Sequence, residues 1–363
     1  MKTDKPTKEY FTRWLLHWNK TQNNRAMPWK GEKDPYKIWL SEIILQQTRV
    51  EQGRDYYNRF VAAYPNISRL AKAPETKVFK LWEGLGYYTR CKNLLATARF
   101  IANERKGKFP ETYDEILALK GVGPYTAAAI ASFAYNLPHA VVDGNVFRVL
   151  ARYFGIDIAV DSTEGKKYFT ELAAELLDKK NAGIYNQALM DFGAVVCKPQ
   201  QPLCTNCPLQ KNCAAFATNK TTVLPVKEKK IQVKNRWFCY FIILYKNEVL
   251  VKRRGAGDIW EGLYEFVLQE NKADIAVKKL SIHPFVKMFA AKDPIAIGWK
   301  TSPVYKQLLS HQQINGRFVT IKATKKMELQ GYNWITLKKL KSLPFPKFIT
   351  AYLKEKNVSL DSP

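Results

Sequence analysis

The chain has 363 residues, of which 46% are hydrophobic and 25% are charged. This length predicts two or three domains of about 100–200 residues each. The composition is typical of a globular protein and excludes a chain that is mainly disordered. The longest apolar run, Trp237 to Tyr245, has the length of a strand and not of a membrane span. The first six residues lack an apolar segment, so no secretory signal is expected.

The charge is strongly positive, because 58 Lys and Arg oppose 32 Asp and Glu. Residues 1–220 hold 32 basic and 21 acidic side chains, and the remaining residues hold 26 and 11. A chain that is basic in both halves attracts polyanions, and nucleic acid is the expected partner. Charge alone leaves open a basic protein without such a partner. An anionic membrane surface is disfavoured, because no basic amphipathic helix with a strong apolar face is evident.

Residues 1–220 have the apolar spacing of helices, beginning with aromatic and leucine side chains three and four positions apart between Tyr10 and Trp18. Glycine and proline separate the predicted helices. These cover residues 10–18, 35–44, 78–85, 93–102, 113–119, 125–135, 146–154, 168–177 and 185–196.

The pattern changes after residue 220. Residues 221–235 are rich in lysine and lack helical spacing, which predicts a basic linker able to lie along DNA. Strands are predicted over 236–245, 248–253, 263–268, 305–311, 318–323 and 332–336, with helices near 274–280 and 346–354. Residues 236–363 therefore read as an α+β domain.

Four of the six cysteines fall within 17 residues, at Cys197, Cys204, Cys207 and Cys213. Six cysteines are too few for a disulfide scaffold of this length, so the cluster predicts a metal centre in a reducing compartment. Four thiolates hold either zinc or an iron–sulfur cluster. Only one C-x2-C pair is present, which favours iron–sulfur, with zinc and no metal as the alternatives. We expect the loop to present Lys198, Lys211 and neighbouring residues to phosphate.

The segment Leu119 to Ala127 places two glycines, Gly121 and Gly123, in a short turn between apolar helices. Glycine permits positive φ and close backbone approach. The N–H groups of such a turn, and of the helix that begins near Pro124, can bind a phosphate oxygen without reading base sequence. An ordinary helix–helix turn is the alternative.

Two carboxylates stand out. Asp143 precedes a predicted helix, where it can act as N-cap and where the helix dipole favours its ionised form. Glu42 lies among Ile38, Ile43 and Leu45, and an apolar setting raises the pKa of a carboxyl. Such a pair suits cleavage of an N-glycosidic bond, which needs a proton on the leaving base and negative charge near the sugar. A capping Asp and a solvated Glu are the alternatives.

These strings together resemble the bacterial MutY adenine DNA glycosylases of the endonuclease III, or helix-hairpin-helix, superfamily. The resemblance runs over nearly the whole chain and includes residues 28–29, 35–36, 39–48, 84–90, 119–127, 143–146 and 186–188 and the four cysteines. It implies a multidomain protein: an all-α helix-hairpin-helix glycosylase with a [4Fe-4S] loop, followed by an α+β MutT/Nudix-like domain. The six-helix subdomain would span about 28–137, the iron–sulfur subdomain 1–27 plus 138–220, and the recognition domain 236–363.

The resemblance also implies an activity, the removal of adenine mispaired with 8-oxoguanine or guanine after the adenine is flipped out of the duplex. Glu42 would protonate adenine N7 and later help activate water, and Asp143 would stabilise the oxocarbenium ion or bond transiently to C1′. Asn145 and Tyr125 would hold these groups. Gln47 and Tyr87 would wedge into the duplex, and Arg25, Trp29 and Gln187 would form part of the adenine pocket. Trp39 and Tyr88 are expected to be core aromatics.

Superfamily members that also cut the strand carry a lysine where this chain has Tyr125, so a monofunctional glycosylase is expected. In the second domain, Leu309-Ser310-His311 resembles the F-S-H loop that contacts 8-oxoguanine, with leucine replacing phenylalanine, and Ser310 and His311 would bind the lesion. Residues 267–280 lack the acidic run that binds magnesium in Nudix hydrolases, so no triphosphate hydrolysis is expected.

By the same resemblance the cysteines would hold a [4Fe-4S] cluster. The protein is expected to act as a monomer on duplex DNA in the bacterial cytoplasm, associated with the nucleoid and not with a membrane. Three other functions remain as alternatives: a bifunctional pyrimidine glycosylase/lyase, a DNA-binding redox sensor without enzymatic activity, and a Nudix hydrolase. The first is disfavoured by Tyr125, which replaces the lysine of the lyases. The second leaves the Glu42/Asp143 pair unexplained, and the third lacks the acidic run that binds magnesium.

Overall fold

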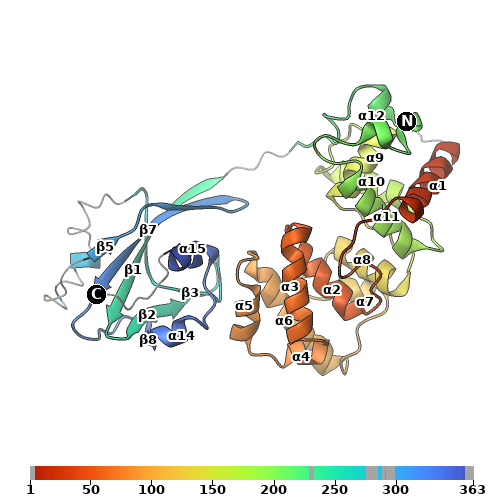
Figure 1. The fold of residues 1–363 in the computed structure, drawn as a ribbon. Helices are drawn as coiled ribbons and strands as arrows, with labels where there is room; N and C mark the ends of the chain where they lie inside the picture. Colours follow the sequence, from red (N-terminus) through yellow and green to blue (C-terminus); the bar gives the residue numbers. More distant parts are fainter. Residues whose placement is uncertain (1–4, 229–232, 275–284, 288–290, 292–298, 356–363) are drawn as a thin grey trace. The chain divides into compact units, whose positions relative to one another are not determined.

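The computed structural model describes residues 5–228, 233–274, 285–287, 291 and 299–355 (Figure 1). The chain forms two compact units. The first combines Met1–Lys72 with Asn93–Lys229, and the second combines Ala73–Lys92 with Lys230–Pro363. None of the described helices is long and apolar enough to cross a lipid bilayer.

The first unit is helical, in agreement with the sequence. Its helices before the hairpin are α1 (Lys5–Thr21), α2 (Pro35–Leu45), α3 (Val50–Ala63), α4 (Ile67–Ala71) and most of α6 (Tyr88–Glu104). The hairpin lies between α7 (Tyr113–Leu117) and α8 (Pro124–Tyr135). There follow α9 (Gly144–Phe154), α10 (Thr163–Leu176), α11 (Ala182–Val195), the 3-10 turns Cys204–Asn206 and Gln210–Asn212, and α12 (Ala214–Ala217).

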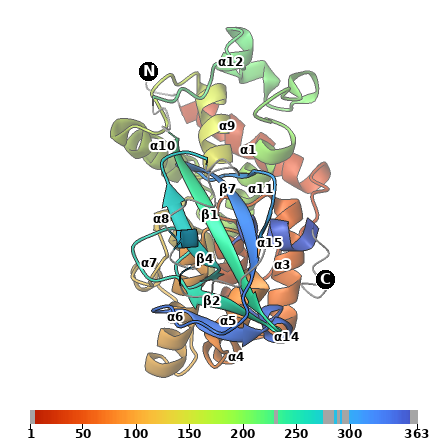
Figure 2. The ribbon, with the colours of Figure 1, turned by 90° about the vertical axis from the view of Figure 1, so that its left-hand side faces the viewer.

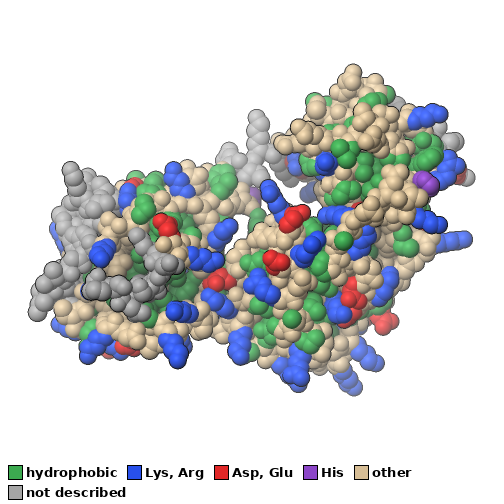
Figure 3. Space-filling model, viewed as in Figure 1, with side chains coloured by type: hydrophobic (Ala, Val, Ile, Leu, Met, Phe, Trp, Pro, Cys, Tyr) green, Lys and Arg blue, Asp and Glu red, His purple; other side chains and the backbone are tan. Residues whose placement is uncertain are grey.

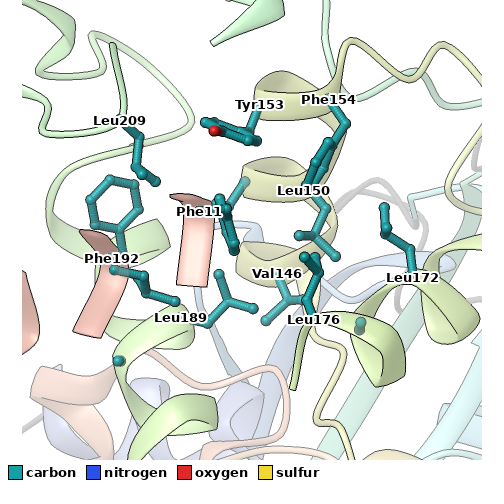
Figure 4. Packing of buried hydrophobic residues seen from close by; sticks show 14 of the residues in the cluster. Phe11, Val146, Leu150, Tyr153, Phe154, Leu172, Leu176, Leu189, Phe192 and Leu209 are labelled. Carbon is teal, nitrogen blue, oxygen red and sulfur yellow. The ribbon is translucent and has the colours of Figure 1, made fainter. Parts of the chain in front are cut away.

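One apolar core joins the N-terminal helix to the helices that follow the hairpin. Phe11 of α1, Leu150 of α9 and Phe192 of α11 are at most 2% exposed and point toward one another (Figure 4). Leu209 of the cysteine loop completes the same cluster. Burying each of these side chains contributes about 1.5–3 kcal/mol. The cysteine loop is therefore fixed to the same core that holds α9 and α11.

Helix α8 packs against α2 and α7. Seven consecutive residues of α8, from Thr126 to Ser132, are buried, and most are small, including Ala127, Ala129 and Ala131, which have no exposed surface. Small side chains allow two helix backbones to approach closely. This packing brings Tyr125, at the start of α8, near Glu42 in the buried middle of α2.

The second unit is built on a sheet in which β1 (Lys234–Tyr245) and β7 (Gln312–Lys322) run in parallel. Their register extends from Lys234 opposite Gln312 to Leu244 opposite Lys322, and Figure 2 shows the two long strands alongside each other. Gly316 permits this pairing, because a Cβ there would lie 2.2 Å from the carbonyl oxygen of Phe238. The turn that precedes β7 is therefore attached directly to the long, regularly paired strands β1 and β7.

The remaining strands are antiparallel to β1, β2 or β7. They are β2 (Glu248–Arg253), β3 (Tyr264–Glu265), β4 (Val267–Asn271), β5 (Trp299–Thr301), β6 (Tyr305–Leu308) and β8 (Asn333–Thr336). Helices α14 (Leu337–Leu340) and α15 (Lys347–Glu355) follow.

Helix α5 (Glu75–Trp82) belongs to this second unit, although it lies early in the sequence. Arg253 forms an ion pair with Glu75 at 2.8 Å, and the backbone N–H of Phe345 donates to Glu83 at 2.9 Å. Lys80 donates to the carbonyl oxygen of Leu343 at 3.1 Å. Sequence spacing identified the helix but not these partners, which are more than 170 positions away.

Several predicted boundaries differ from the structure. The strand expected over 305–311 ends at Leu308, because residues 309–311 form the turn into β7. The strand expected over 318–323 begins earlier, at Gln312, and 263–268 divides into β3 and β4. Strand β5 was not predicted. The helix expected near 274–280 lies almost wholly outside the described residues.

Parts of the predicted linker, 221–235, belong to the two units. The N–H of Val160 donates to the carbonyl oxygen of Val226, and Arg152 donates to that of Leu224, at 3.0 Å each. Residues 234–235 are already part of β1. The described first part of this segment therefore packs on the helical unit, because its backbone finds hydrogen-bond partners there.

Candidate active site

A cavity of about 180 Å³ opens in the first unit. Its walls come from the end of α1, from the connection between α1 and α2, from α2 itself, from α8 and from the start of α11. Apolar walls are joined by a few polar groups, as in most small-molecule sites. The lining residues are Asn19, Trp29, Lys30, Gly31, Glu32, Lys33, Ile38, Ser41, Glu42, Phe133, Gly183, Ile184 and Gln187.

Glu42 is the buried acid of this cavity. It lies on α2, which begins at Pro35 behind the N-cap Asp34, and it is 5% exposed. Burial raises the pKa of Glu42 to about 7, a hydrogen bond from Tyr125 opposes that rise, and the charge of Asp143 adds to it. A carboxyl with this pKa carries a proton for much of the time at neutral pH and can donate it. The apolar setting predicted for Glu42 is confirmed.

Asp143 caps helix α9, as predicted. One carboxylate oxygen accepts from the backbone N–H groups of Asn145 and Val146 at 2.8 Å each, and the other accepts from the side-chain amide of Asn145 at 2.7 Å. Burial nevertheless raises the pKa of Asp143, and these hydrogen bonds only oppose that rise. The hydrogen bonds at the helix terminus favour the anion, as expected, but the sequence did not reveal the desolvation that acts against it.

Asn145 is held in turn by Arg148, a residue that sequence reasoning missed. The guanidinium of Arg148 donates to the side-chain oxygen of Asn145 at 2.8 Å and to the carbonyl oxygens of Gly193 and Cys197 at 2.7 and 2.8 Å. A continuous set of hydrogen bonds therefore leads from Asp143 to the first cysteine of the loop. Its sequence signal is an arginine three residues after Asn145, in a helix whose buried residues, apart from Arg148 and Arg152, are hydrophobic.

The hairpin turn leaves backbone donors at the start of α8. Gly121 has φ +80°, and a Cβ there would lie 2.7 Å from the Cβ of Asn93, so the turn requires glycine. Gly123 has a φ of −101°, which any residue can adopt, so positive φ is needed at only one of the two glycines. Among the described residues no side chain caps α8, and its first N–H groups remain for an anion.

The four cysteines line one small cavity of about 30 Å³. Arg152 donates to the sulfur of Cys197 at 3.5 Å and to the carbonyl oxygen of Lys198 at 2.7 Å. Burial raises the pKa of Cys207 to about 12. Within the described ranges, no three or more His, Cys, Asp and Glu side chains are arranged as a metal site. Four thiols around one cavity beside a cation nonetheless fit a cluster that binds thiolates, because binding would displace their protons.

The residues predicted for the adenine pocket fall in one region. Trp29 and Gln187 line the cavity, and Trp29 packs edge-on against Tyr57 with ring centroids 5.3 Å apart. Arg25 is not a lining residue; it pairs at 2.7 Å with Asp191, a buried acid that the sequence analysis overlooked. The signal for Asp191 was available, since it is the one charged residue of α11.

Gln47 follows the end of α2 and has φ +56°, an unusual conformation for this residue type. Tyr87, in the second unit, has φ +47° and is 47% exposed. Its hydroxyl is hydrogen-bonded to the hydroxyl of Ser310 in the turn between β6 and β7. His311 lies in the same turn, and its carbonyl oxygen accepts from the N–H of Lys234 at 3.0 Å. Trp39 and Tyr88 are buried, which confirms them as core aromatics.

The surface is rich in basic side chains. Figure 3 shows lysine and arginine side chains spread over the visible face of each unit, with acidic side chains fewer and scattered among them. This distribution agrees with the composition, in which 58 Lys and Arg outnumber 32 Asp and Glu. Such a surface attracts the phosphate backbone of nucleic acid without regard to sequence.

Two family matches cover most of the chain. Residues 40–179 match the HhH-GPD superfamily base excision DNA repair protein family, and residues 239–355 match the NUDIX domain family. Among solved structures, a thermostable thymine-DNA glycosylase superposes with a TM-score of 0.55 at 31% identity, over 59% of this chain and 98% of that one. Endonuclease III in a non-covalent complex with DNA shares the fold, with a TM-score of 0.51 at 21% identity over 60% of this chain and 99% of its own.

Curated relatives identify the activity. The adenine DNA glycosylase of Buchnera aphidicola subsp. Baizongia pistaciae is 36% identical over 286 residues, which are 75% of this chain and 80% of the relative. The adenine DNA glycosylase of Homo sapiens is 40% identical over 210 residues, which are 55% of this chain and 38% of the relative. The chain therefore belongs to the adenine DNA glycosylases, base excision repair enzymes that hydrolyse an N-glycosyl bond, and it joins a helix-hairpin-helix glycosylase region to a Nudix domain.

Proposed function

We propose that this glycosylase releases adenine paired with 8-oxoguanine, or with guanine, in duplex DNA, and that it leaves the strand uncut. The observation that carries the proposal is Glu42, a buried carboxyl with a pKa of about 7 that lines the cavity and is electrostatically coupled to Asp143. An acid and a second carboxylate are what cleavage of this bond requires. Adenine must leave the base stack to reach such a cavity, so the enzyme flips the nucleotide.

In the proposed mechanism Glu42 donates its proton to N7 of adenine, so that the base departs as a neutral molecule. Positive charge develops on C1′ of the deoxyribose as the bond breaks. Asp143 faces that charge and stabilises it, or bonds transiently to C1′. The Glu42 carboxylate left behind then accepts a proton from the attacking water, which restores the acid.

Two residues hold these carboxyls. Tyr125 donates a hydrogen bond to Glu42, and Asn145 donates both its backbone and its side-chain N–H to Asp143. Each contact restricts the orientation of a reacting group before substrate binds, which lowers the cost of reaching the transition state. Tyr125 and Asn145 are therefore proposed as positioning groups in the active site.

The same tyrosine supports the monofunctional proposal. Strand cleavage by these enzymes requires an amine that attacks C1′ and forms a Schiff base. Tyr125 offers a phenol instead, and burial raises its pKa well above the ordinary value. A protonated phenol neither attacks C1′ nor forms an imine.

The remaining residues are proposed to bind the DNA around the flipped adenine. Gly121 and Gly123 place backbone N–H groups against a phosphate. Gln47 and Tyr87, both with strained backbone, wedge into the duplex. Arg25, Trp29 and Gln187 shape the adenine pocket. Ser310 and His311 contact 8-oxoguanine, for which the exposed turn between β6 and β7 is suitable.

We also propose that the second unit binds the lesion and does not hydrolyse nucleotides. Three of its carboxylates are already engaged by arginine: Arg254 pairs with Glu265, and Arg236 pairs with Asp258 and Glu270 at 2.6 Å each. A carboxylate held by a guanidinium is a poor ligand for magnesium, because the cation already satisfies its charge.

Cys197, Cys204, Cys207 and Cys213 would hold a [4Fe-4S] cluster. Such a cluster would crosslink the loop through these thiolates and would fix the backbone that carries Lys198 and Lys211. We propose that the enzyme works as a monomer, since the carboxyls and the cavity lie within one unit.

One assay tests the proposal. Duplexes containing A:8-oxoguanine, A:G, T:G and thymine glycol are incubated with the enzyme, and products are separated with and without alkali. We expect cleavage of the first two duplexes, and only after alkali opens the abasic site. Release of thymine or thymine glycol would contradict the substrate. Efficient trapping of the wild-type enzyme on DNA by borohydride would contradict the monofunctional chemistry.

A further inference from the structure

A second acid lies behind the wall of the cavity. Asp191 of α11 is fully buried, with 0% of its surface exposed. Four donors surround its carboxylate: Arg25 at 2.7 Å, Asn23 at 2.9 Å, and Gln187 and Lys30 at 3.0 Å each. A buried carboxylate is tolerated only when it is paired and hydrogen-bonded, and here two cations and two amides satisfy it.

The network reaches the cavity through Gln187. Gln187 precedes Asp191 by four residues, so both side chains lie on one face of α11, and Gln187 lines the cavity together with Glu42. A carboxylate only accepts hydrogen bonds. The amide of Gln187 must therefore turn its nitrogen to Asp191, which leaves its oxygen as the group available to a ligand.

Glu42 and this oxygen together match one edge of adenine. That edge presents N7, an acceptor, beside the amino group on C6, a donor. Glu42 supplies the donor for N7, and the Gln187 oxygen is an acceptor for the amino group. A 6-oxopurine such as guanine or hypoxanthine presents two acceptors there, so its carbonyl oxygen would face the Gln187 oxygen.

We propose that Asp191 is a positioning residue for substrate selection: it fixes the Gln187 amide so that the pocket accepts a 6-aminopurine and rejects a 6-oxopurine. The inference rests on the proposed release of adenine. In this proposal Asp191 touches no substrate atom. It determines that the pocket presents a hydrogen-bond acceptor, the Gln187 oxygen, to the base.

The substitution Asp191→Asn tests this directly. A carboxamide both donates and accepts, so the Gln187 amide is free to turn over and present its nitrogen to the base. Single-turnover rates are measured for adenine and for hypoxanthine, each opposite 8-oxoguanine. We expect the ratio of the adenine rate to the hypoxanthine rate to fall by about tenfold, the effect of one lost hydrogen bond.

The matched control is Asp178→Asn in the same unit. That carboxylate accepts from the backbone N–H of Lys180 and the side chain of Asn181, outside the cavity. This variant should keep the wild-type ratio. A general loss of structure in Asp191→Asn would lower both rates by the same factor, so an unchanged ratio in that variant overturns the proposal.

A second variant keeps the test decisive when Asp191→Asn does not fold. Gln187→Leu removes the amide and should also lower the ratio, and adding Asp191→Asn to it should lower the ratio no further. A wild-type ratio in Gln187→Leu overturns the proposal. Failure of the wild-type enzyme to release adenine is a different result, because it refutes the proposed function itself.

Discussion

The hydroxyl of Tyr125 hydrogen-bonds the carboxyl of Glu42 and so connects the hairpin helix α8 to α2. Tyr125 comes two residues after Gly123, at the end of the turn that we assign to a phosphate. One side chain therefore links the backbone that would hold the DNA to the acid that would protonate its base. The hydrogen bond also opposes the rise in the pKa of Glu42 that burial causes.

The pH profile should report this contact. Since Glu42 must be protonated to act, the rate of base release should fall as pH rises through about 7, the pKa of Glu42. Tyr125→Phe removes the hydrogen bond that lowers this pKa, so the fall should move to higher pH. Single-turnover rates between about pH 5 and pH 9 measure both. Tyr135→Phe, at the other end of α8, should keep the wild-type profile. If the rate of Tyr125→Phe falls at the same pH as that of wild type, the effect of Tyr125 on the pKa of Glu42 is refuted.

Burying Glu42 should cost stability at neutral and higher pH. Its pKa rises from 4.5 to about 7 in the folded protein, so the folded state retains a proton that the unfolded chain releases in this window. Stability is lost as pH rises from about 4.5 to about 7. Glu42→Gln mimics the neutral form, so its free energy of unfolding should exceed that of wild type by about 3 kcal/mol at pH 8 and by little at pH 4. Urea unfolding at pH 4 and pH 8 measures the difference in free energy of unfolding between Glu42→Gln and wild type. The same difference at both pH values would contradict a raised pKa of Glu42 in the folded protein.

Asp143→Asn should stop base release and leave DNA binding intact. Asparagine still caps a helix, so α9 should persist, but the charge that faces C1′ is gone. We expect the rate on A:8-oxoguanine duplex to fall by at least about a hundredfold. The control is Asp34→Asn, the same change at the N-cap of α2, which should keep the rate. Full activity in Asp143→Asn would remove the role assigned to this residue.

Removing one cysteine of the loop should remove the cluster. Cys207→Ala leaves three thiols around the cavity, so bound iron and visible absorbance should be lost. The midpoint of thermal unfolding should also fall, because Leu209 of the same loop belongs to the core of α1, α9 and α11. Cys91→Ala is the control, since Cys91 does not line that cavity, and its iron content should equal that of wild type. Normal iron in Cys207→Ala would show that the loop does not hold the cluster through this residue.

Arg148 illustrates what local pattern could not reveal. Its position on α9 follows from helical spacing, but its partners Gly193 and Cys197 lie about 45 residues away, and only the packing of α9 on α11 brings them together. The same holds for α5, whose helical spacing was evident and whose partners in the second unit were not. Long-range hydrogen bonds depend on the fold and leave no periodic signal in the sequence.

The sequence alone determined the properties that depend on neighbouring residues. Helical spacing located α8 and α9, the residue pattern after position 235 indicated most of the described strands, and the position of Asp143 before a helix predicted it as the cap of α9. Tertiary structure decided the rest. It placed Glu42 within reach of Tyr125 and Asp143, from segments about 80 and 100 positions apart, and it set the pKa values of both carboxyls, because burial is a property of the packed chain. For the same reason only the folded chain shows that Asp191 is buried and that it binds the amide of Gln187.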